Sequence, residues 1–286
     1  MPQEAKLVMS VMKAFRLLDI LSEVKSPLSL AELSERSGWP KSTVYGLLSS
    51  MREKGTLPAD GFAVKSLVST RMAEAICKAF GVACYDVPTG FRFISEKIDE
   101  SARTGKGTFL FGFEESYGFL AGSFARDKDA ICAAMLLSEA CVVYKEQGKT
   151  LYDVLQEMYA TYGYFKEAVK SYTLEGKAGI EKIGSAMAAL RRDPPAKIGG
   201  EAVSAWEDFI VGERRTAAGA EPIGLPKSDV LRYFLPGGAW LCIRPSGTEP
   251  KLKLYIGASA QKEALVDERL ANLLAGAEGI LGRLLD

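Results

Sequence analysis

Strand-like and helix-like segments alternate along the chain from about residue 64, and this alternation constrains the fold more than any other feature. Two apolar runs have the length of buried strands, at 64–69 and 108–113. Helical patterns separate or follow them, at 71–80, 89–102, 129–145 and 150–162. Strands joined through helices pair in parallel, and the helices cover the sheet. The sequence therefore predicts an α/β domain here.

The C-terminal part has a different order of segments. A helical pattern at 180–191 leads to Asp193-Pro194-Pro195, a stiff break that predicts a domain boundary. Strand-like segments separated by turns follow, at 203–210, 230–235, 239–243 and 252–256. The chain ends in a helix predicted from Lys262. This order predicts a small α+β domain.

Charge and composition bound the possible functions. Lys plus Arg is 36 and Asp plus Glu is 36, so no net basic charge indicates a nucleic-acid partner, although a local basic patch remains compatible. No apolar stretch is long enough to span a bilayer and no signal sequence is evident, so we expect a cytoplasmic protein without membrane contact. The 5 cysteines lack metal-ligand spacing and predict buried thiols. Without histidine, His-ligated metals are excluded, and we expect no metal site.

Residues 10–52 predict three short helices. Ser29 precedes the second, and Glu32 completes a capping box. Pro40 stands in the first turn of the third helix, after a turn at Gly38. Two helices around a glycine turn are typical of a helix-turn-helix, although a plain three-helix bundle has the same periodicity. In a DNA-binding domain, the start of the third helix would contact DNA through Lys41, Ser42, Thr43 and Tyr45.

The segment LCIRPSGTEPKLKLYI, residues 241–256, reads as two strands around a polar loop. Gly247 allows backbone N–H groups to curl toward a ligand. A guanidinium, an ammonium and hydroxyl groups in one turn suit a phosphate; these are carried by Arg244, Lys251, Ser246 and Thr248. The alternative is an ordinary hairpin turn with solvated charges. We predict a phosphate site.

A second polar loop, GFEESYGFLAGSFARDKD, follows the strand predicted at 108–113. Its residues lie at the carboxyl edge of a parallel sheet, where α/β proteins bind ligands. Glu114 and Ser116 are two positions apart, so an extended loop points both to one side, where they can bind neighbouring sugar hydroxyls. Arg126 and Lys128 add cations just before a helix whose N-terminus attracts anions. Together the two loops predict a ligand with hydroxyls at one end and phosphate at the other.

Residues from about 10 to 57 resemble the N-terminal winged helix of IclR-type transcription regulators, mainly through SLAELSERSGWPKSTVYGLLSSMREKG. The resemblance implies a recognition helix at 40–51 and a β-wing after Gly55. The sequence departs from the family at the wing. A turn at Asp60-Gly61 could imitate its tip, but the residues after it belong to the α/β region.

The motifs TGFRFI, GFEESYG, RDKDA and RPSGTEPKLK resemble the α-D-phosphohexomutase superfamily, specifically phosphoglucomutase and phosphomannomutase. The similarity covers about residues 54–286. It implies a multidomain α/β protein with the third (α/β) and fourth (small α+β) domains of that family behind a three-helix, winged helix-turn-helix. The domains assigned are 1–57, 58–170 and 171–286.

The same resemblance implies roles for individual residues. Glu114 and Ser116 would bind the sugar, the turn at Thr89 and Gly90 would help to discriminate its epimer, and Lys128 would contact the substrate. The phosphate would be held by Arg244, Ser246, Gly247, Thr248 and Lys251. No catalytic residue is implied within these motifs.

Two parts of the family pattern are absent from this sequence: a phosphoserine loop of the Ser-His-Asn-Pro type and a Mg²⁺ loop of the Asp-Gly-Asp-Gly-Asp type. The full-length family uses Mg²⁺ and a bisphosphorylated sugar, and we expect no cofactor within this chain. Phosphoryl transfer needs a phosphoryl donor and a cation, so we expect hexose-phosphate binding without turnover. Three interpretations stay open: a DNA-binding regulator with a sugar-phosphate sensor, a mutase remnant, and a half-enzyme completed by a separate chain that supplies the first two domains.

Overall fold

The computed structural model describes residues 20, 30–38, 58–247 and 249–285. Helix α2 (Leu30–Ser37) coincides with the second of the three predicted N-terminal helices. The other predictions for the N-terminal region lie outside the described residues, including the DNA contacts at Lys41, Ser42, Thr43 and Tyr45. Thr248 of the predicted phosphate loop also lies outside them.

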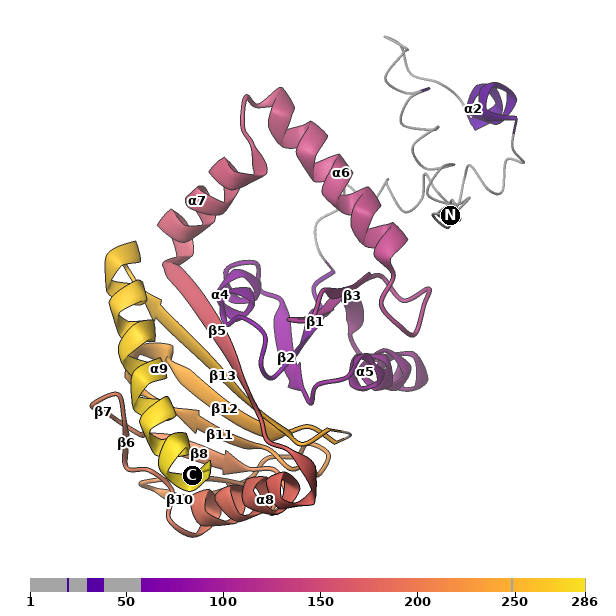
Figure 1. Ribbon diagram of the computed structural model, residues 1–286. Helices are drawn as coiled ribbons and strands as arrows, with labels where there is room; N and C mark the ends of the chain where they lie inside the picture. Colours follow the sequence, from indigo (N-terminus) through magenta and orange to yellow (C-terminus); the bar gives the residue numbers. More distant parts are fainter. Residues whose placement is uncertain (1–19, 21–29, 39–57, 248, 286) are drawn as a thin grey trace, which may run out of the picture.

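A four-stranded sheet with the order β2-β1-β3-β4 forms the first domain (Figure 1), called the α/β domain below. Its strands are β1 (Gly61–Ser66), β2 (Ala83–Val87), β3 (Thr108–Glu114) and β4 (Gly118–Ala121). β1 pairs in parallel with both β2 and β3, as the alternation of strands and helices predicts. β4 turns back antiparallel to β3 through a short hairpin that the sequence pattern did not reveal.

Two helices connect the parallel strands and lie on opposite faces of the sheet: α4 (Met72–Ala79) and α5 (Phe91–Thr104). Phe62 and Val64 of β1 pack with Phe91 and Ile94 of α5 in one buried cluster. Ala63, between them, faces α4. This alternation follows from the period of two along a strand.

Two more helices lead from the end of β4 toward the second sheet: α6 (Ala130–Glu146) and α7 (Leu151–Tyr162). Asp129 caps α6 by accepting the N–H groups of Ile131 and Cys132, at 2.8 and 2.9 Å. Thr150 and Asp153 form a capping box at the start of α7. Neither of these fully described helices has a buried residue, although α6 is largely apolar.

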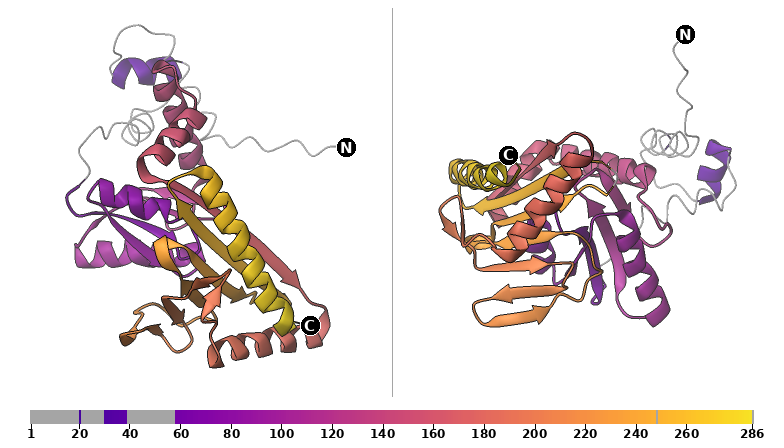
Figure 2. Two further views of the ribbon diagram at one scale, coloured as in Figure 1. Left: turned by 90° about the vertical axis from the view of Figure 1, so that its left-hand side faces the viewer. Right: turned by 60° about the horizontal axis from the view of Figure 1, so that its bottom comes forward.

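The second domain, called the C-terminal domain below, is an antiparallel seven-stranded sheet of order β10-β9-β8-β11-β12-β13-β5. The strands are β5 (Tyr164–Thr173), β8 (Ala205–Asp208), β9 (Glu213–Thr216), β10 (Gly219–Pro222), β11 (Leu231–Phe234), β12 (Trp240–Pro245) and β13 (Lys251–Ala260). Two long helices cover one face (Figure 2), α8 (Gly176–Arg192) and α9 (Glu263–Leu285). Shorter elements are β6 (Lys197–Ile198), β7 (Glu201–Ala202) and η1 (Pro236–Gly238). The predicted α+β architecture is confirmed.

Strand β5 belongs to this second sheet over its whole length, because it pairs with β13 from Tyr164 to Thr173. The assigned division at 170/171 therefore falls inside a paired strand. The break at Asp193-Pro194-Pro195 ends α8 but lies within the C-terminal domain, since α8 and β5 pack with the strands that follow it. The partner of β5 is about 90 residues further along the chain, so no local pattern marks this boundary.

The two domains meet through the sheet face opposite α8 and α9. Leu67 and Val68, which follow β1, join a buried cluster with Trp240, Cys242 and Tyr255 of β12 and β13. Of the five cysteines, all within the described ranges, Cys242 is buried and Cys141 is exposed. The prediction of buried thiols is thus wrong for Cys141, because it lies on the open side of α6. None of the described helices combines the length and the apolar character that crossing a membrane requires.

Candidate functional site

The carboxyl ends of β1, β2 and β3 lie at one edge of the α/β sheet, because the three strands are parallel. Ser66 ends β1, the turn at Thr89 and Gly90 follows β2, and Glu114 ends β3. Such an edge is where open α/β sheets bind ligands. The candidate site consists of this edge together with the loop 244–251 of the C-terminal domain, called the Arg244 loop below.

Glu114 is the buried carboxylate of the site, with 7% of its surface exposed. Its Oε1 accepts the backbone N–H of Gly90 at 2.6 Å. Gly90 has a φ of 121°, a conformation that favours glycine, and it stands directly before α5. The carboxylate of Glu114, at the end of β3, therefore holds the start of α5 in place.

The side chains of Lys128 and Glu114 both approach Gly118. A Cβ built on Gly118 would stand 3.1 Å from Cδ of Lys128 and 3.4 Å from Oε2 of Glu114. The ammonium group is 3.2 Å from Asp127 and 5.7 Å from the centre of the Phe91 ring. A carboxylate that can accept from a hydroxyl and a cation thus lie side by side, whereas the sequence pattern paired Glu114 with Ser116.

Arg244 connects the two domains at the site. Its Nη1 donates to the hydroxyl of Thr89 at 2.5 Å, so the end of β12 contacts the turn before α5. Among the described residues, no side chain caps the N-terminus of α5. The carboxylate of Glu114 already meets the partial positive charge of that helix end at Gly90, and the guanidinium of Arg244 adds a second positive group beside the same turn.

The rest of the Arg244 loop is closed by its own backbone. The N–H of Ser246 donates to the carbonyl of Lys251 at 2.7 Å. Gly247 is exposed, and the ammonium of Lys251 lies 3.0 Å from Glu249. Behind the loop, residues of α8 complete a cavity of about 260 Å³. The ammonium of Lys251 has three N–H donors, so it can contact a ligand as well as Glu249.

Two residues predicted for the site do not converge on it in the same way. Arg126 pairs with Asp99 of α5 and donates to the carbonyls of Ser123 and Ala125 at 2.8 and 3.0 Å. It thus holds its own loop against α5 rather than facing a ligand. Ser116 is exposed in the turn between β3 and β4.

The residue after Ser116 is conformationally unusual. Tyr117 has a φ of 66° and its side chain is 90% exposed. A bulky residue in the left-handed region is strained, and such strain tends to occur at functional positions. Tyr117 therefore belongs with the exposed rim of the site.

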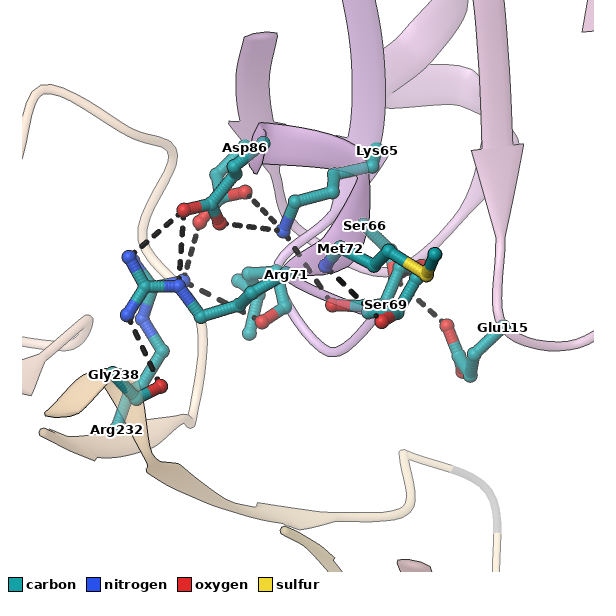
Figure 3. Close-up of polar contacts among 12 residues, drawn as sticks. Lys65, Ser66, Ser69, Arg71, Met72, Asp86, Glu115, Arg232 and Gly238 are labelled. Atoms are coloured by element: carbon teal, nitrogen blue, oxygen red, sulfur yellow. Dashed lines mark hydrogen bonds and ion pairs between the residues drawn. The ribbon is translucent and has the colours of Figure 1, made fainter. Parts of the chain in front are cut away.

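Sequence reasoning missed the charged network between the domains (Figure 3). Lys65 is 1% exposed, and its ammonium lies 2.7 Å from Asp86. Arg232 of β11 donates to Asp86 at 2.5 Å and to Glu207 of β8 at 2.7 Å. Burial alone would raise the pKa of Asp86, but Lys65 and Arg232 lower it below its ordinary value. The only sequence signal was a lysine inside an otherwise apolar strand.

A hydroxyl at the end of β1 links this network to the site. Ser66 donates to Glu115, next to Glu114, at 2.7 Å, and it lies 2.9 Å from the hydroxyl of Ser69 (Figure 3). Burial, together with the negative charge of Glu115, raises the pKa of Tyr255 to about 12. Tyr255 is therefore a neutral phenol under ordinary conditions, at the interface below the Arg244 loop.

Family comparisons match three stretches of the chain. Residues 39–162 match "Phosphoglucomutase/phosphomannomutase, alpha/beta/alpha domain III", and residues 186–273 match the C-terminal domain of the same family. Residues 10–61 match the IclR helix-turn-helix domain. The first and third matches overlap over residues 39–61.

Among curated relatives, the phosphoglucomutase of Staphylococcus saprophyticus is 37% identical over 202 residues, 70% of this chain and 36% of the relative. That of Staphylococcus haemolyticus is 34% identical over 232 residues, 80% of this chain and 42% of the relative. The chain thus spans about two fifths of these relatives' length. Among solved structures, the open form of the phosphoglucomutase pp63/parafusin from Paramecium has a TM-score of 0.55 at 17% identity. The superposition covers 76% of this chain and 37% of the parafusin chain. This likeness shows the fold.

Proposed function

We propose that this chain, which contains the third and fourth domains of the phosphoglucomutase/phosphomannomutase family, binds a hexose phosphate at the candidate site. One observation carries the proposal. A hydrogen bond between the two domains joins Arg244 to Thr89. Gly90, the next residue, donates its backbone N–H to Glu114. An anion-binding guanidinium and a buried carboxylate are thereby held at one place.

Each end of the ligand has its own partners. Arg244 uses one N–H group on Thr89; within the described part of the chain its guanidinium has no other hydrogen-bond partner, so its other N–H groups can bind a phosphate. The N-terminus of α5 adds to the positive potential beside the guanidinium. Glu114 accepts from sugar hydroxyls, and Lys128 donates to them; Ser116 is close enough in sequence to reach the same sugar.

We further propose that these residues bind the sugar phosphate without converting it. Phosphoryl transfer requires a phosphoryl donor and a cation that neutralises developing charge. Among the described residues, no group of three or more metal-ligating side chains fits a metal ion, so the Mg²⁺ that the family uses has no ligand set there. Turnover would need a phosphoryl donor and a cation site that the described residues do not supply.

Replacing Arg244 with alanine should weaken hexose-phosphate binding by about 10- to 100-fold, because a charge-assisted contact contributes about 1.5–3 kcal/mol.

Glu114→Gln keeps an acceptor for Gly90 but removes the carboxylate charge, and should reduce the preference for glucose 6-phosphate over inorganic phosphate. Arg126→Ala is the matched control, since that side chain is engaged with Asp99. Calorimetry with both ligands measures all three variants.

Equal affinity of the parent and Arg244→Ala for glucose 6-phosphate would contradict the site. A loss in Arg126→Ala as large as that in Arg244→Ala would show that the wrong cation was assigned. Conversion of glucose 1-phosphate to glucose 6-phosphate by the purified chain, abolished in Glu114→Gln, would contradict binding without turnover.

A second candidate function is a DNA-binding regulator that responds to the sugar phosphate, and the IclR helix-turn-helix match over residues 10–61 favours it. In this case Lys41, Ser42, Thr43 and Tyr45 contact DNA. Few cations are available, so binding should be weak and should be detectable only at low salt. A mobility shift at low salt should then depend on Lys41 and change with glucose 6-phosphate. If no genomic fragment is retained at low salt, this candidate fails.

A further inference from the structure

A polar cavity of about 550 Å³ lies between the two domains, and none of its lining residues belongs to the candidate site. One wall is the part of the α/β domain formed by α4 and β2, and the other is the C-terminal domain through β9, β11 and β12. Five lining residues are cationic and only two are carboxylates. The volume lies in the range of small-molecule sites rather than of single ions.

Both carboxylates of the lining are held by buried cations. The ammonium of Lys65 lies 2.7 Å from Asp86 and 3.2 Å from Glu74. Arg232 pairs with Asp86 and with Glu207, which stands behind the lining (Figure 3 shows the first of these pairs). Neither lining carboxylate is therefore left as an unpaired negative charge that would repel an anion.

Two further cations of the lining come from α4, on one wall. Arg71 pairs with Glu74 at 2.8 Å and donates to the carbonyl of Gly238 at 3.3 Å, across the domain interface. Lys78, two turns further along α4, is exposed, and within the described part of the chain its ammonium has no ion pair or hydrogen bond. Lys78 thus leaves all three of its donors at the rim of the cavity.

The fifth cation, Arg214 of β9, stands on the opposite wall. Its two nearest carboxylates, Glu207 and Glu221, are 3.8 and 3.6 Å away, and its buried Nε has no hydrogen-bond partner among the described residues. The guanidinium lies over the ring of Phe234 instead, 4.7 Å from its centre. A buried donor without an acceptor is unusual. Arg214 is therefore held in position by an aromatic ring while its N–H groups stay available.

We propose that this cavity binds a small polyanion of the diphosphate type, which bridges the two domains. Lys78 and Arg71 bind it from α4, and Arg214 binds it from β9. Two linked phosphate groups carry enough acceptor oxygens to satisfy cations on both walls at once. A neutral sugar finds no free carboxylate in this lining, so binding here is independent of hexose-phosphate binding at the candidate site.

Calorimetry with pyrophosphate tests the site, using the full chain with Arg244→Ala so that the Arg244 loop does not contribute. One pyrophosphate should bind. Adding Lys78→Gln or Arg214→Gln should weaken binding by about 10-fold or more, as for one lost charge-assisted contact. Inorganic phosphate should bind at least about 10-fold more weakly than pyrophosphate, because it reaches only one wall.

Arg215→Gln is the matched control for Arg214→Gln. Arg215 is the next residue of β9, so its side chain points to the other face of the strand. There it pairs with Glu213 at 3.1 Å and lies over the ring of Trp206. This variant should bind pyrophosphate as its Arg244→Ala parent does.

Three results would overturn the proposal. Pyrophosphate binding that disappears in Arg244→Ala would place the anion at the Arg244 loop. A loss in Arg215→Gln as large as that in Arg214→Gln would show attraction to general positive charge rather than a site. Equal affinities for phosphate and pyrophosphate would exclude a ligand that bridges the walls. Lys78→Gln changes an exposed side chain, so it carries the test if circular dichroism shows that Arg214→Gln does not fold.

Discussion

Arg232→Ala is expected to lower the free energy of unfolding by about 3–5 kcal/mol, as breaking a buried ion pair does when one charge is left without its partner. The side chain of Arg232 is 10% exposed, and those of Glu207 and Asp86 are 5% and 24% exposed. Removal of the guanidinium leaves Glu207 with only the more distant Arg214, at 3.8 Å, whereas Asp86 keeps Lys65 at 2.7 Å. Urea unfolding measures the loss.

An exposed arginine provides the control for this prediction. Arg215 pairs with Glu213 at 3.1 Å, with the two side chains 51% and 40% exposed. Arg215→Ala should cost less than about 1 kcal/mol, because solvent screens such pairs. Similar losses in the two variants would mean that the Arg232 network contributes nothing specific.

The pH dependence of the same network has a defined sign. The pKa of Asp86 is lowered in the folded chain, so its contribution is present above its unfolded pKa of about 4 and is lost as the pH falls toward the folded value. Without Arg232, the pKa of Asp86 moves back toward its unfolded value. The Arg232→Ala variant should therefore lose less stability than the parent between about pH 5 and 3.

Gly276→Ala is expected to destabilise the C-terminal domain by about 1–3 kcal/mol, the usual cost of overpacking. A Cβ at this position on α9 would stand 2.2 Å from the backbone nitrogen of Gly199 and 2.6 Å from its Cα. The obstacle is backbone, which cannot rotate away as a side chain can. Gly199 in turn has a φ of 56°, and a Cβ added to it would stand 2.6 Å from the carbonyl oxygen of Asn272.

Gly282→Ala, six positions further along α9, should have the opposite effect. Nothing lies within 4 Å of an added Cβ there, and alanine in a helix is more stable than glycine by about 0.5–1 kcal/mol. Thermal unfolding of the two variants compares them directly. A Gly276→Ala variant as stable as Gly282→Ala would show that the turn between β6 and β7 moves aside without cost.

The stability of the Arg232 network also bears on the candidate site. Asp86 lies in β2, and the turn at Thr89 follows that strand directly. Arg244 lies in β12, the neighbour of β11 that carries Arg232. The ion pair from Arg232 to Asp86 and the bond from Arg244 to Thr89 therefore join two neighbouring strands, β11 and β12, to β2 and the turn after it, so the network helps to position Arg244.

The sequence by itself determined most of the helices and the strands with strong apolar patterns. Helices α6 and α7 begin one residue after the starts predicted at 129 and 150, and in the structure Asp129 and Thr150 cap them. Strands β3, β12 and β13 follow apolar runs, and the polar loops after β3 and between β12 and β13 were recognisable from the residues. These features depend on caps and periodicities, which involve residues close together in the chain.

Strands without such a pattern escaped the prediction. β2 alternates between exposed and half-buried residues, and β5 is mostly half-buried or exposed. β5 exists because it pairs with β13, and β4 because the hairpin returns it to β3. In each case the stabilising partner is another strand rather than the segment's own composition, which is why the domain boundary could not be placed from the residues.

Tertiary structure alone decided which polar residues meet. Arg126 and Lys128 are two positions apart and look equivalent in sequence, yet one pairs with Asp99 and the other lies beside Glu114. Arg244 and Thr89 are 155 positions apart, and Arg232 and Asp86 are 146 apart. Contacts over such separations depend on how two sheets pack face to edge, and that arrangement is set by the buried cluster between the domains rather than by any local periodicity.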